Sequence, residues 1–276
     1  MHNARSTGHG AVTWPPVGVR QVTGTFLSLV DDAAPGLVEG LYLHGSLGFG
    51  EWYDGRSDID YVAVLARRPA EVVDTLRDVH ARIAEMFPRP PFDGFHLTWG
   101  DLARPSYDCP DVPCTQAGYL HEEARLDVHP VTWHELARHG VTVRGPELEK
   151  VDIWTDEAVL RKYTHDNLRS YWLEQAEALR RFPAEAGKSD IVAWFVLGAS
   201  RLHHLLARGA LTSKMGAGRH ALEVFGERWR PIITEAMTIR ELGEPSGQYD
   251  GDTDLRARDT IEFSEMVVKT GLAIPV

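Results

Sequence analysis

The sequence predicts an α+β domain followed by an all-helical domain. Short strand-like runs alternate with helical stretches in the first half of the chain, whereas the second half has helical spacing throughout. Gly145-Pro146 ends the mixed region and places the boundary near residue 150. We therefore expect a flexible tail over residues 1–18, an α+β domain over 19–150 and a helical bundle over 151–276.

The elements of the first domain follow from hydrophobic spacing and from the glycines and prolines between them. Apolar residues recur at helical spacing over residues 69–87, and residues 95–99 alternate as a half-buried strand does. A proline-rich loop is expected at 105–113. The predicted helices are 20–32, 69–87 and 130–139, and the predicted strands are 37–44, 59–65 and 95–99.

The second domain is predicted to contain helices only. Its breaks are marked by Pro183, Gly187, Gly209, Gly226 and the glycine-rich stretch 243–251. The predicted helices lie near 156–182, 190–208, 213–225, 229–242 and 253–270.

Composition excludes some classes of partner. The net charge of -11 would repel the phosphates of a nucleic acid, so no nucleic acid partner is expected. An acidic surface attracts cationic small molecules, although many cytoplasmic proteins are acidic without such a role. The longest apolar run, Ile191–Ala199, is far shorter than the roughly 20 residues that span a bilayer. With two cysteines and no signal-peptide pattern, we expect a cytoplasmic monomer without a membrane partner.

The stretch HGSLGFGEWYDGRSDIDYVAV, residues 44–64, carries the chemistry. Asp58 and Asp60 are separated by one residue at the start of a strand, so both side chains point to one face. Two neighbouring carboxylates repel each other unless a cation lies between them. Mg²⁺ prefers one or two carboxylates together with substrate phosphates. The alternative is that Asp58 caps a turn and Asp60 lies at a strand edge.

Residues before the aspartates provide the expected phosphate site. Gly45 lets a phosphate approach the backbone closely, and Ser46 and Ser57 can each donate a hydrogen bond to it. A helix starting after Ser46 would add free N–H groups. A strand, Gly-Ser, about a dozen residues and then Asp-x-Asp is more specific than Asp-x-Asp alone.

This stretch resembles the signature of the nucleotidyltransferases related to DNA polymerase β. More narrowly, it resembles the aminoglycoside adenylyltransferases that modify streptomycin and spectinomycin. The segments DVHPVTWHELARHGVTVRGPEL and LGASRLHHLLARGALTSKMGAGRHALEVFGERWRPIITEAMTIR are similar to the end of the family's catalytic domain and to its helical domain. The resemblance covers about residues 37–242.

The resemblance implies specific roles. Asp58 and Asp60 would bind two Mg²⁺ ions, and Ser46 and Ser57 would contact the phosphates of ATP. Arg201 and Lys214 match positions where the family holds the triphosphate with cations of its helical domain. On the residues alone, each of these two cations is more simply a solvated surface residue.

The chain departs from the family at the third strand. The family has a carboxylate there, usually Glu, as general base, but the position that aligns best is near Gly94. Asp93 is the nearest carboxylate and the candidate base; the alternative is a structural Asp in a turn.

The acceptor site is the least defined. Candidate substrate-binding residues are Glu122, Asp190 and Tyr119, with Trp99, Tyr107 and Glu123 as further possibilities. Zinc binding by Cys109 and Cys114 with His121 and His129 is disfavoured by their spacing.

The function implied by the resemblance is transfer of AMP from Mg-ATP to a hydroxyl of a small polycationic acceptor. An aminoglycoside-type antibiotic is the acceptor expected first, which would make the protein a resistance enzyme. Another small metabolite or a protein side chain is the alternative acceptor, and nucleotide binding without turnover is the alternative to catalysis.

Overall fold

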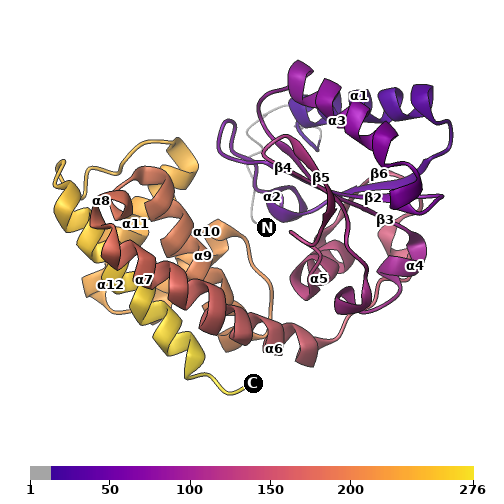
Figure 1. The fold of residues 1–276 in the computed structure, drawn as a ribbon. Helices are drawn as coiled ribbons and strands as arrows, with labels where there is room; N and C mark the ends of the chain where they lie inside the picture. The colour runs from indigo at the N-terminus through magenta and orange to yellow at the C-terminus, as the bar shows by residue number, and fades with distance from the viewer. Residues whose placement is uncertain (1–13) are drawn as a thin grey trace, which may run out of the picture.

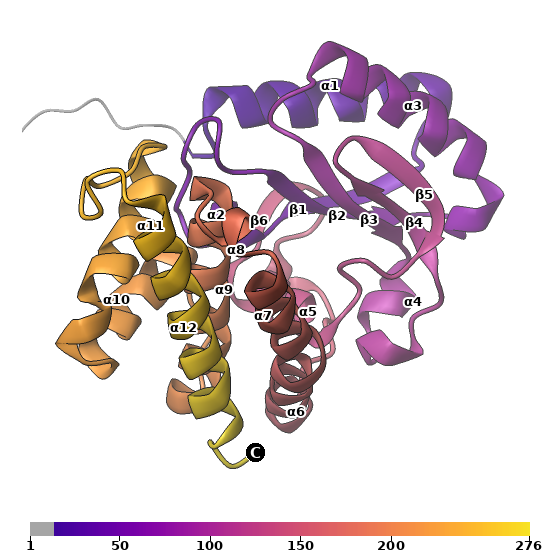
Figure 2. The same cartoon turned by 60° about the vertical axis from the view of Figure 1, so that its left-hand side comes forward.

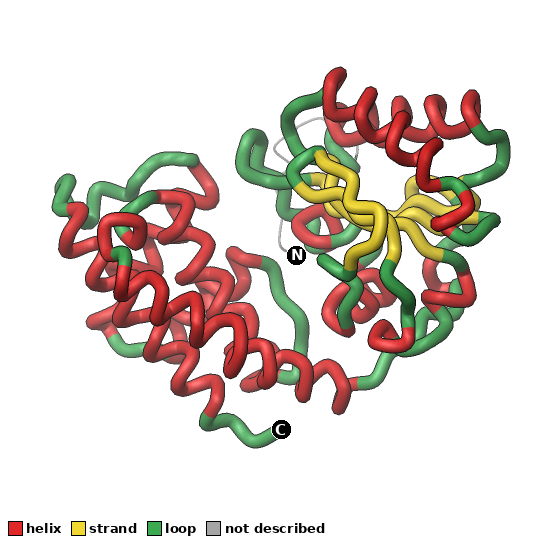
Figure 3. Tube along the Cα trace, in the orientation of Figure 1, coloured by secondary structure: helices red, strands yellow, loops and turns green. Residues whose placement is uncertain are grey.

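A six-stranded sheet and a bundle of helices lie side by side in the computed structural model, which describes residues 14–276 (Figure 1). The sheet has the order β5-β4-β3-β2-β1-β6. Its strands are β1 Val38–Leu43, β2 Ile59–Leu65, β3 Phe92–Leu97, β4 Val112–Gln116, β5 Tyr119–Ala124 and β6 Val141–Arg144. The helices of this part are α1 Val17–Ala33, α2 Gly45–Gly48, α3 Val73–Met86, α4 Trp99–Leu102 and α5 Pro130–His139. All strands precede all bundle helices in the chain. Figure 3 shows the strands gathered in one part of the molecule, beside the bundle.

The two faces of the sheet are covered differently. Helices α1 and α3 cover one face, where Ile59 and Tyr61 of β2 are packed among their apolar side chains. The other face packs against α5, where Val62 and Val64 lie in one cluster with Trp133. Because side chains alternate along a strand, Asp60 belongs to the α5 face of β2.

Strands β2 and β3 form the parallel pair of the sheet, and their register sets the site. Asp60 is the partner of Asp93, and Tyr61 is the partner of Gly94. Neighbouring residues of a parallel pair point to the same face, so Asp93 shares the face of Asp60. The other pairs, β1–β2, β1–β6, β3–β4 and β4–β5, are antiparallel.

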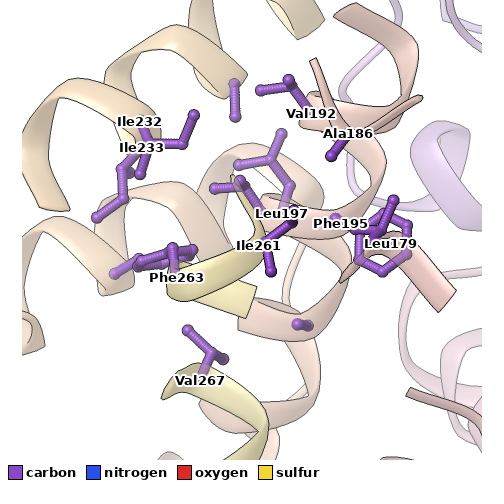
Figure 4. Packing of buried hydrophobic residues seen from close by; sticks show 14 of the residues in the cluster. Leu179, Ala186, Val192, Phe195, Leu197, Ile232, Ile233, Ile261, Phe263 and Val267 are labelled. Carbon is purple, nitrogen blue, oxygen red and sulfur yellow. The ribbon is translucent and has the colours of Figure 1, made fainter. Parts of the chain in front are cut away.

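The bundle is built around α9. Its helices are α6 Glu157–Asn167, α7 Leu173–Arg181, α8 Pro183–Ala186, α9 Ser189–Arg208, α10 Lys214–Val224, α11 Arg230–Leu242 and α12 Thr253–Leu272. A π-helical segment, Leu168–Trp172, joins α6 to α7. Phe195 and Leu197 of α9 pack with Ile233 of α11 and with Phe263 and Val267 of α12 in one core (Figure 4). In Figure 2 the bundle faces the end of the sheet that carries α2.

The predicted fold class is confirmed. The predicted strand 59–65 and the predicted helix 130–139 coincide with β2 and α5. The sequence did not reveal β4, β5 or β6. Strand β4 is buried except at its last residue, β5 is mostly exposed and β6 is half-buried throughout, so none of them shows the alternation by which a half-buried strand is recognised.

The predicted domain boundary and the predicted end of the tail can each be compared with the observed elements. The boundary near residue 150 falls between β6 and α6. Of the predicted tail, residues 1–13 lie outside the described residues, and α1 already begins at Val17. No helix within residues 14–276 has the length and apolar character needed to cross a membrane. Cys109 and Cys114 are both buried free thiols.

Candidate active site

A cavity of about 250 Å³ lies between the sheet domain and the bundle. Its wall on the sheet side includes the start of β2, the turn after β1 and the start of α5, and its wall on the bundle side includes α9, α10 and α11. The lining residues used below are His44, Gly45, Ser46, Arg56, Asp58, Asp60, Asp127, His129, Glu135, Trp172, Arg201, Lys214 and Arg240. Gly45 and five other residues predicted from the sequence to form the nucleotide site therefore line one cavity: Ser46, Asp58, Asp60, Arg201 and Lys214.

The turn after β1 brings its backbone against Asp60. Gly45 has φ +57°, and a Cβ atom there would lie 2.0 Å from Oδ2 of Asp60. The backbone N–H of His44 also donates to the carbonyl of Asp60 at 3.1 Å. Gly45 is therefore required both for its left-handed conformation and for the space that the carboxylate occupies. The helix expected after Ser46 is the four-residue α2, too short to act through a helix dipole.

Replacing Gly45 by Ala should lower the activity expected at this site about 100-fold or more, because the new Cβ displaces the carboxylate of Asp60, the predicted metal ligand. Gly50→Ala is the matched control. Gly50 also has a positive φ, +69°, but nothing lies within 4 Å of its added Cβ. The Gly50→Ala variant should keep its activity and lose about 1–3 kcal/mol of stability through backbone strain alone. Steady-state rates and thermal unfolding of both variants check this; equal activities of the two would contradict it.

Several neighbouring carboxylates make the sheet side of the cavity favourable for binding cations. Burial, and then the charges of Asp127, Asp58 and Glu135, raise the pKa of Asp60 to about 7 although His44 opposes them. Asp60 is enclosed by protein atoms while part of its surface faces the cavity. Carboxylate oxygens are the hard ligands that Mg²⁺ prefers.

The two carboxylates do not form a complete protein cage for a metal ion. No group of three or more His, Cys, Asp or Glu side chains with the arrangement of a metal site occurs among residues 14–276. Asp58 and Asp60 thus offer two carboxylates and leave the remaining ligands to come from elsewhere, which is the pattern typical of Mg²⁺ bound with substrate phosphates.

His44 and Glu135 form a buried pair beside Asp60. Nδ1 of His44 lies 3.5 Å from Oε2 of Glu135, and both side chains are 8% exposed. Burial opposes charge on both groups. Nevertheless Glu135 and Asp60 raise the pKa of His44, while His44 and Arg201 lower the pKa of Glu135. Each group thus favours the charged form of the other, and their contact joins the turn after β1 to α5.

The bundle supplies the positive charge. Arg201 comes from α9, Lys214 is the first residue of α10, and Arg240 is near the end of α11. Burial, and then Arg240 and Arg201, lower the pKa of Lys214 to about 8 against the opposite effect of Asp60 and Asp58. A cation at the start of an eleven-residue helix is unfavourable for the helix itself, so this position suits an anion in the cavity.

The two serines lie where the sequence placed them, at either end of the loop that joins β1 to β2. Ser46 lines the cavity and Ser57 is buried. Nη2 of Arg240 donates to both hydroxyls, each at 2.9 Å. The phosphate-binding serines predicted from the sequence therefore already share one cationic partner from the bundle.

Asp93 lies on the same face as Asp60, one strand away, but it is not among the residues that line the cavity. Its carboxylate accepts the backbone N–H groups of Ala117 at 2.9 Å and Gly118 at 3.4 Å, in the turn between β4 and β5. A side chain at Gly94 would meet the carbonyl of Tyr61 at 2.0 Å, so no carboxylate fits there. The role of Asp93 as general base stays a prediction.

The three predicted substrate residues are not brought to the cavity. Glu122 lies on the outer strand β5 and pairs with Arg77 of α3. Tyr119, at the start of β5, is 75% exposed. Asp190 is exposed in the first turn of α9. Their assignment to the acceptor remains a prediction that the position of the cavity does not favour.

Sequence analysis missed several residues that line the cavity, and one of them left a recognisable signal in the sequence. Asp127, Glu135 and Arg56 gave none that separates them from surface charges. Arg240, however, follows Ile233, Ala236 and Ile239 on the buried stripe of its helix, where an apolar residue is expected. A lone arginine on such a stripe indicates a buried partner.

A second cavity of about 160 Å³ adjoins the first and shares with it His129, Val131, Glu135, Trp172, Arg201 and Leu202. Its other lining residues are Tyr163, Thr164, Asn167, Leu205, Leu211 and Thr212. Glu135 is its single carboxylate, and aromatic rings and neutral hydrogen-bonding groups make up much of the wall. We call this space the adjoining cavity.

Comparison with known proteins supports the fold. The chain is similar to the spectinomycin adenyltransferase AAD(9) from Enterococcus faecialis, whose crystal structure is with ATP and spectinomycin. The TM-score is 0.62 with 14% sequence identity, over 89% of this chain and 98% of that chain. No protein-family model matches the sequence, and a search of the curated proteins likewise finds no match. The likeness confirms the fold that the sequence resemblance implied.

Proposed function

We propose that this protein is a nucleotidyltransferase that transfers AMP from Mg-ATP to a hydroxyl of a small acceptor. One observation carries the proposal. In one interdomain cavity, two carboxylates at the start of β2, Asp58 and Asp60, lie opposite three cations of the bundle, Arg201, Lys214 and Arg240. Carboxylates on one wall suit metal ions, and cations on the other suit a triphosphate. The fold likeness to an adenyltransferase solved with ATP supports the same reading.

The residues of the cavity fit the reaction. Asp58 and Asp60 would hold Mg²⁺, which when bound neutralises charge on the reacting phosphate and on the leaving pyrophosphate. Arg201 and Lys214 would bind the triphosphate oxygens from the opposite wall, and Ser46 and Ser57 would donate hydrogen bonds to them. The acceptor oxygen forms a bond to the α-phosphorus as the bond to pyrophosphate breaks, and the hydroxyl proton goes to a carboxylate.

Two carboxylates compete as the proton acceptor. Asp127 lines the cavity, and its charge raises the pKa of Asp60. The carboxylate of Asp93 instead accepts a hydrogen bond from the β4–β5 turn. We therefore expect Asp127→Asn to reduce kcat about 100-fold with little loss of stability. Asp93→Asn should instead lower the unfolding free energy by about 1–3 kcal/mol with a smaller effect on kcat. Reversed results in rate and unfolding measurements would return the base to Asp93.

The adjoining cavity is the proposed acceptor site. It opens onto the nucleotide cavity through shared residues, and Tyr163 and Trp172 offer aromatic surface to a ring. Its one carboxylate, Glu135, is already paired with His44. This chemistry favours a compact polyhydroxylated acceptor with few ammonium groups over a heavily charged one, while the acidic surface attracts cations in general. Spectinomycin, present in the structure of the similar adenyltransferase, is the first compound to test.

Pyrophosphate release from Mg-ATP with a panel of aminoglycosides and spectinomycin tests the proposal. Release that needs one compound, and that Asp58→Asn, Asp60→Asn abolishes, would support adenylyl transfer and identify the acceptor. Binding of Mg-ATP without release for any compound would move the proposal to another acceptor, a metabolite or a protein side chain. Absence of Mg-ATP binding would refute it.

A further inference from the structure

Arg240, in the last turn of α11, is buried, 7% exposed, and contacts the loop that joins β1 to β2. Its Nη1 donates to the carbonyl of Arg56, and its Nη2 donates to Ser46 and Ser57. Its guanidinium also lies 5.4 Å from the ring centre of Tyr53. One side chain of α11 thus contacts both ends of the loop that carries the carboxylate site.

Arg56 returns the contact from the other side. Its Nε donates to the carbonyl of Arg240 at 3.0 Å and its Nη2 to the carbonyl of Glu241 at 2.7 Å. These are carbonyls of the last turn of α11, which lack partners within the helix. The two arginines therefore exchange contacts across the interface, and this exchange fixes the position of Arg240 within the cavity.

The hydrogen bonds of Arg240 determine what the two hydroxyls can do. A serine hydroxyl has one donor hydrogen and two acceptor positions, whereas an arginine can only donate. Ser57 accepts from Arg240 and also from the backbone N–H of Tyr53, at 3.1 Å, so both of its acceptor positions are used. Among the described residues, no hydrogen bond uses the Ser46 or Ser57 hydroxyl as donor. Both hydrogens remain available to a group that only accepts, such as a phosphate oxygen.

Nε of Arg240 provides an independent sign of a ligand. It is a buried nitrogen without a hydrogen-bond partner in the part of the chain that the structure describes. A buried charged donor without a partner is costly, and a negatively charged ligand in the cavity that Arg240 lines would stabilise it. Lys214 and Arg201, which act on the same cavity, make that ligand an anion.

We propose that Arg240 is the positioning residue of the nucleotide site: it orients the Ser46 and Ser57 hydroxyls as donors to the phosphates and docks the bundle on the loop that carries them. This inference rests on the proposed function. It predicts that Arg240 acts on nucleotide affinity largely through the two serines, and that it has little effect on acceptor binding.

Calorimetric binding of Mg-ATP together with steady-state kinetics tests this. Arg240→Gln should weaken Mg-ATP binding and raise the KM for ATP about 10- to 100-fold, with the KM for the acceptor nearly unchanged. In a Ser46→Ala, Ser57→Ala background, the same substitution should cost clearly less, because its contacts with the hydroxyls are gone and only its charge beside the nucleotide remains. Arg240→Lys should give an intermediate loss, since lysine keeps the charge without the planar fork.

Arg219→Gln is the matched control. Arg219 of α10 also joins the bundle to the β1–β2 loop, through an ion pair with Glu51 at 3.5 Å, but it does not line the cavity. It should leave Mg-ATP binding unchanged. Equal losses for Arg219→Gln and Arg240→Gln would reduce Arg240 to an interface contact, and equal losses with and without the serines would overturn the positioning role. A wild-type protein that does not bind Mg-ATP would refute the proposed function itself, a result distinguishable from both.

Discussion

Replacing Asp60 by asparagine should lower kcat about 1,000-fold or more while the protein remains folded. The expected loss is large because Asp60 lines the cavity and the turn after β1 is built around its carboxylate, with Gly45 and the backbone of His44 against it. An amide of nearly the same shape fits this space, so the geometry of the turn should survive. What disappears is the negative charge that would hold Mg²⁺.

The stability of the same variant is informative. Asp58, Asp127 and Glu135 all act on Asp60 with the same sign of charge. Removing one charge from this group relieves repulsion, so in metal-free buffer the thermal unfolding midpoint of Asp60→Asn should equal or exceed that of the wild type. Asp78→Asn, on an exposed position of α3, is the control for the change of charge and should alter neither rate nor midpoint. An active Asp60→Asn variant would remove Asp60 from the chemistry.

Lys214→Gln should lower kcat/KM for Mg-ATP about 100-fold, because in the proposed reaction this side chain neutralises the leaving pyrophosphate. The pH dependence makes this prediction specific. With a pKa of about 8 before nucleotide binds, Lys214 is charged below pH 8 and loses its proton above it. Triphosphate prefers the charged form, so the KM for Mg-ATP should rise between about pH 8 and pH 9.5.

Lys214→Arg is the matched variant for this pH effect. Arginine stays protonated throughout the range, so its KM for Mg-ATP should no longer rise above pH 8. The difference in the pKa of Lys214 between the folded and the unfolded chain also predicts how the stability of the wild type depends on pH. The unfolded chain holds the Lys214 proton up to its ordinary pKa near 10.4, whereas the folded chain releases it near 8, so this group makes folding more favourable as pH rises between those values. A wild-type KM that is flat from pH 7 to 9.5 would contradict the assignment.

The elements with strong periodicity or a distinctive motif were predictable, and so were the residues that they carry. Asp58, Asp60, Gly45 and Ser46 follow from one strand–turn–strand stretch, because their relation is local and the alternation of β2 fixes their face. Arg201 and Lys214 came only from the resemblance to a family. Nothing local in a helix reveals which of its cations faces another domain.

The acceptor side was not predictable for a physical reason. Asp127, Glu135 and Tyr163 come together because α5 packs against α6 and α6 packs against α9, contacts between residues distant in sequence. Surface-type residues such as Glu122 and Asp190 look the same in a sequence, since an isolated charge carries no information about what lies opposite. Asp93 was found by its nearness to the expected strand, but the turn that occupies its carboxylate depends on β4 and β5, which lack a sequence pattern.

The transfer of label from ATP tests the central claim most directly. ATP labelled at the α-phosphorus and ATP labelled at the γ-phosphorus are each incubated with Mg²⁺, the protein and spectinomycin, and the acceptor is recovered by chromatography. The account predicts that label from the α position enters the acceptor in equal amount to the pyrophosphate released, and that label from the γ position does not. Transfer of the γ label, or release of pyrophosphate without labelled acceptor for every compound of the panel, would contradict adenylyl transfer at this site.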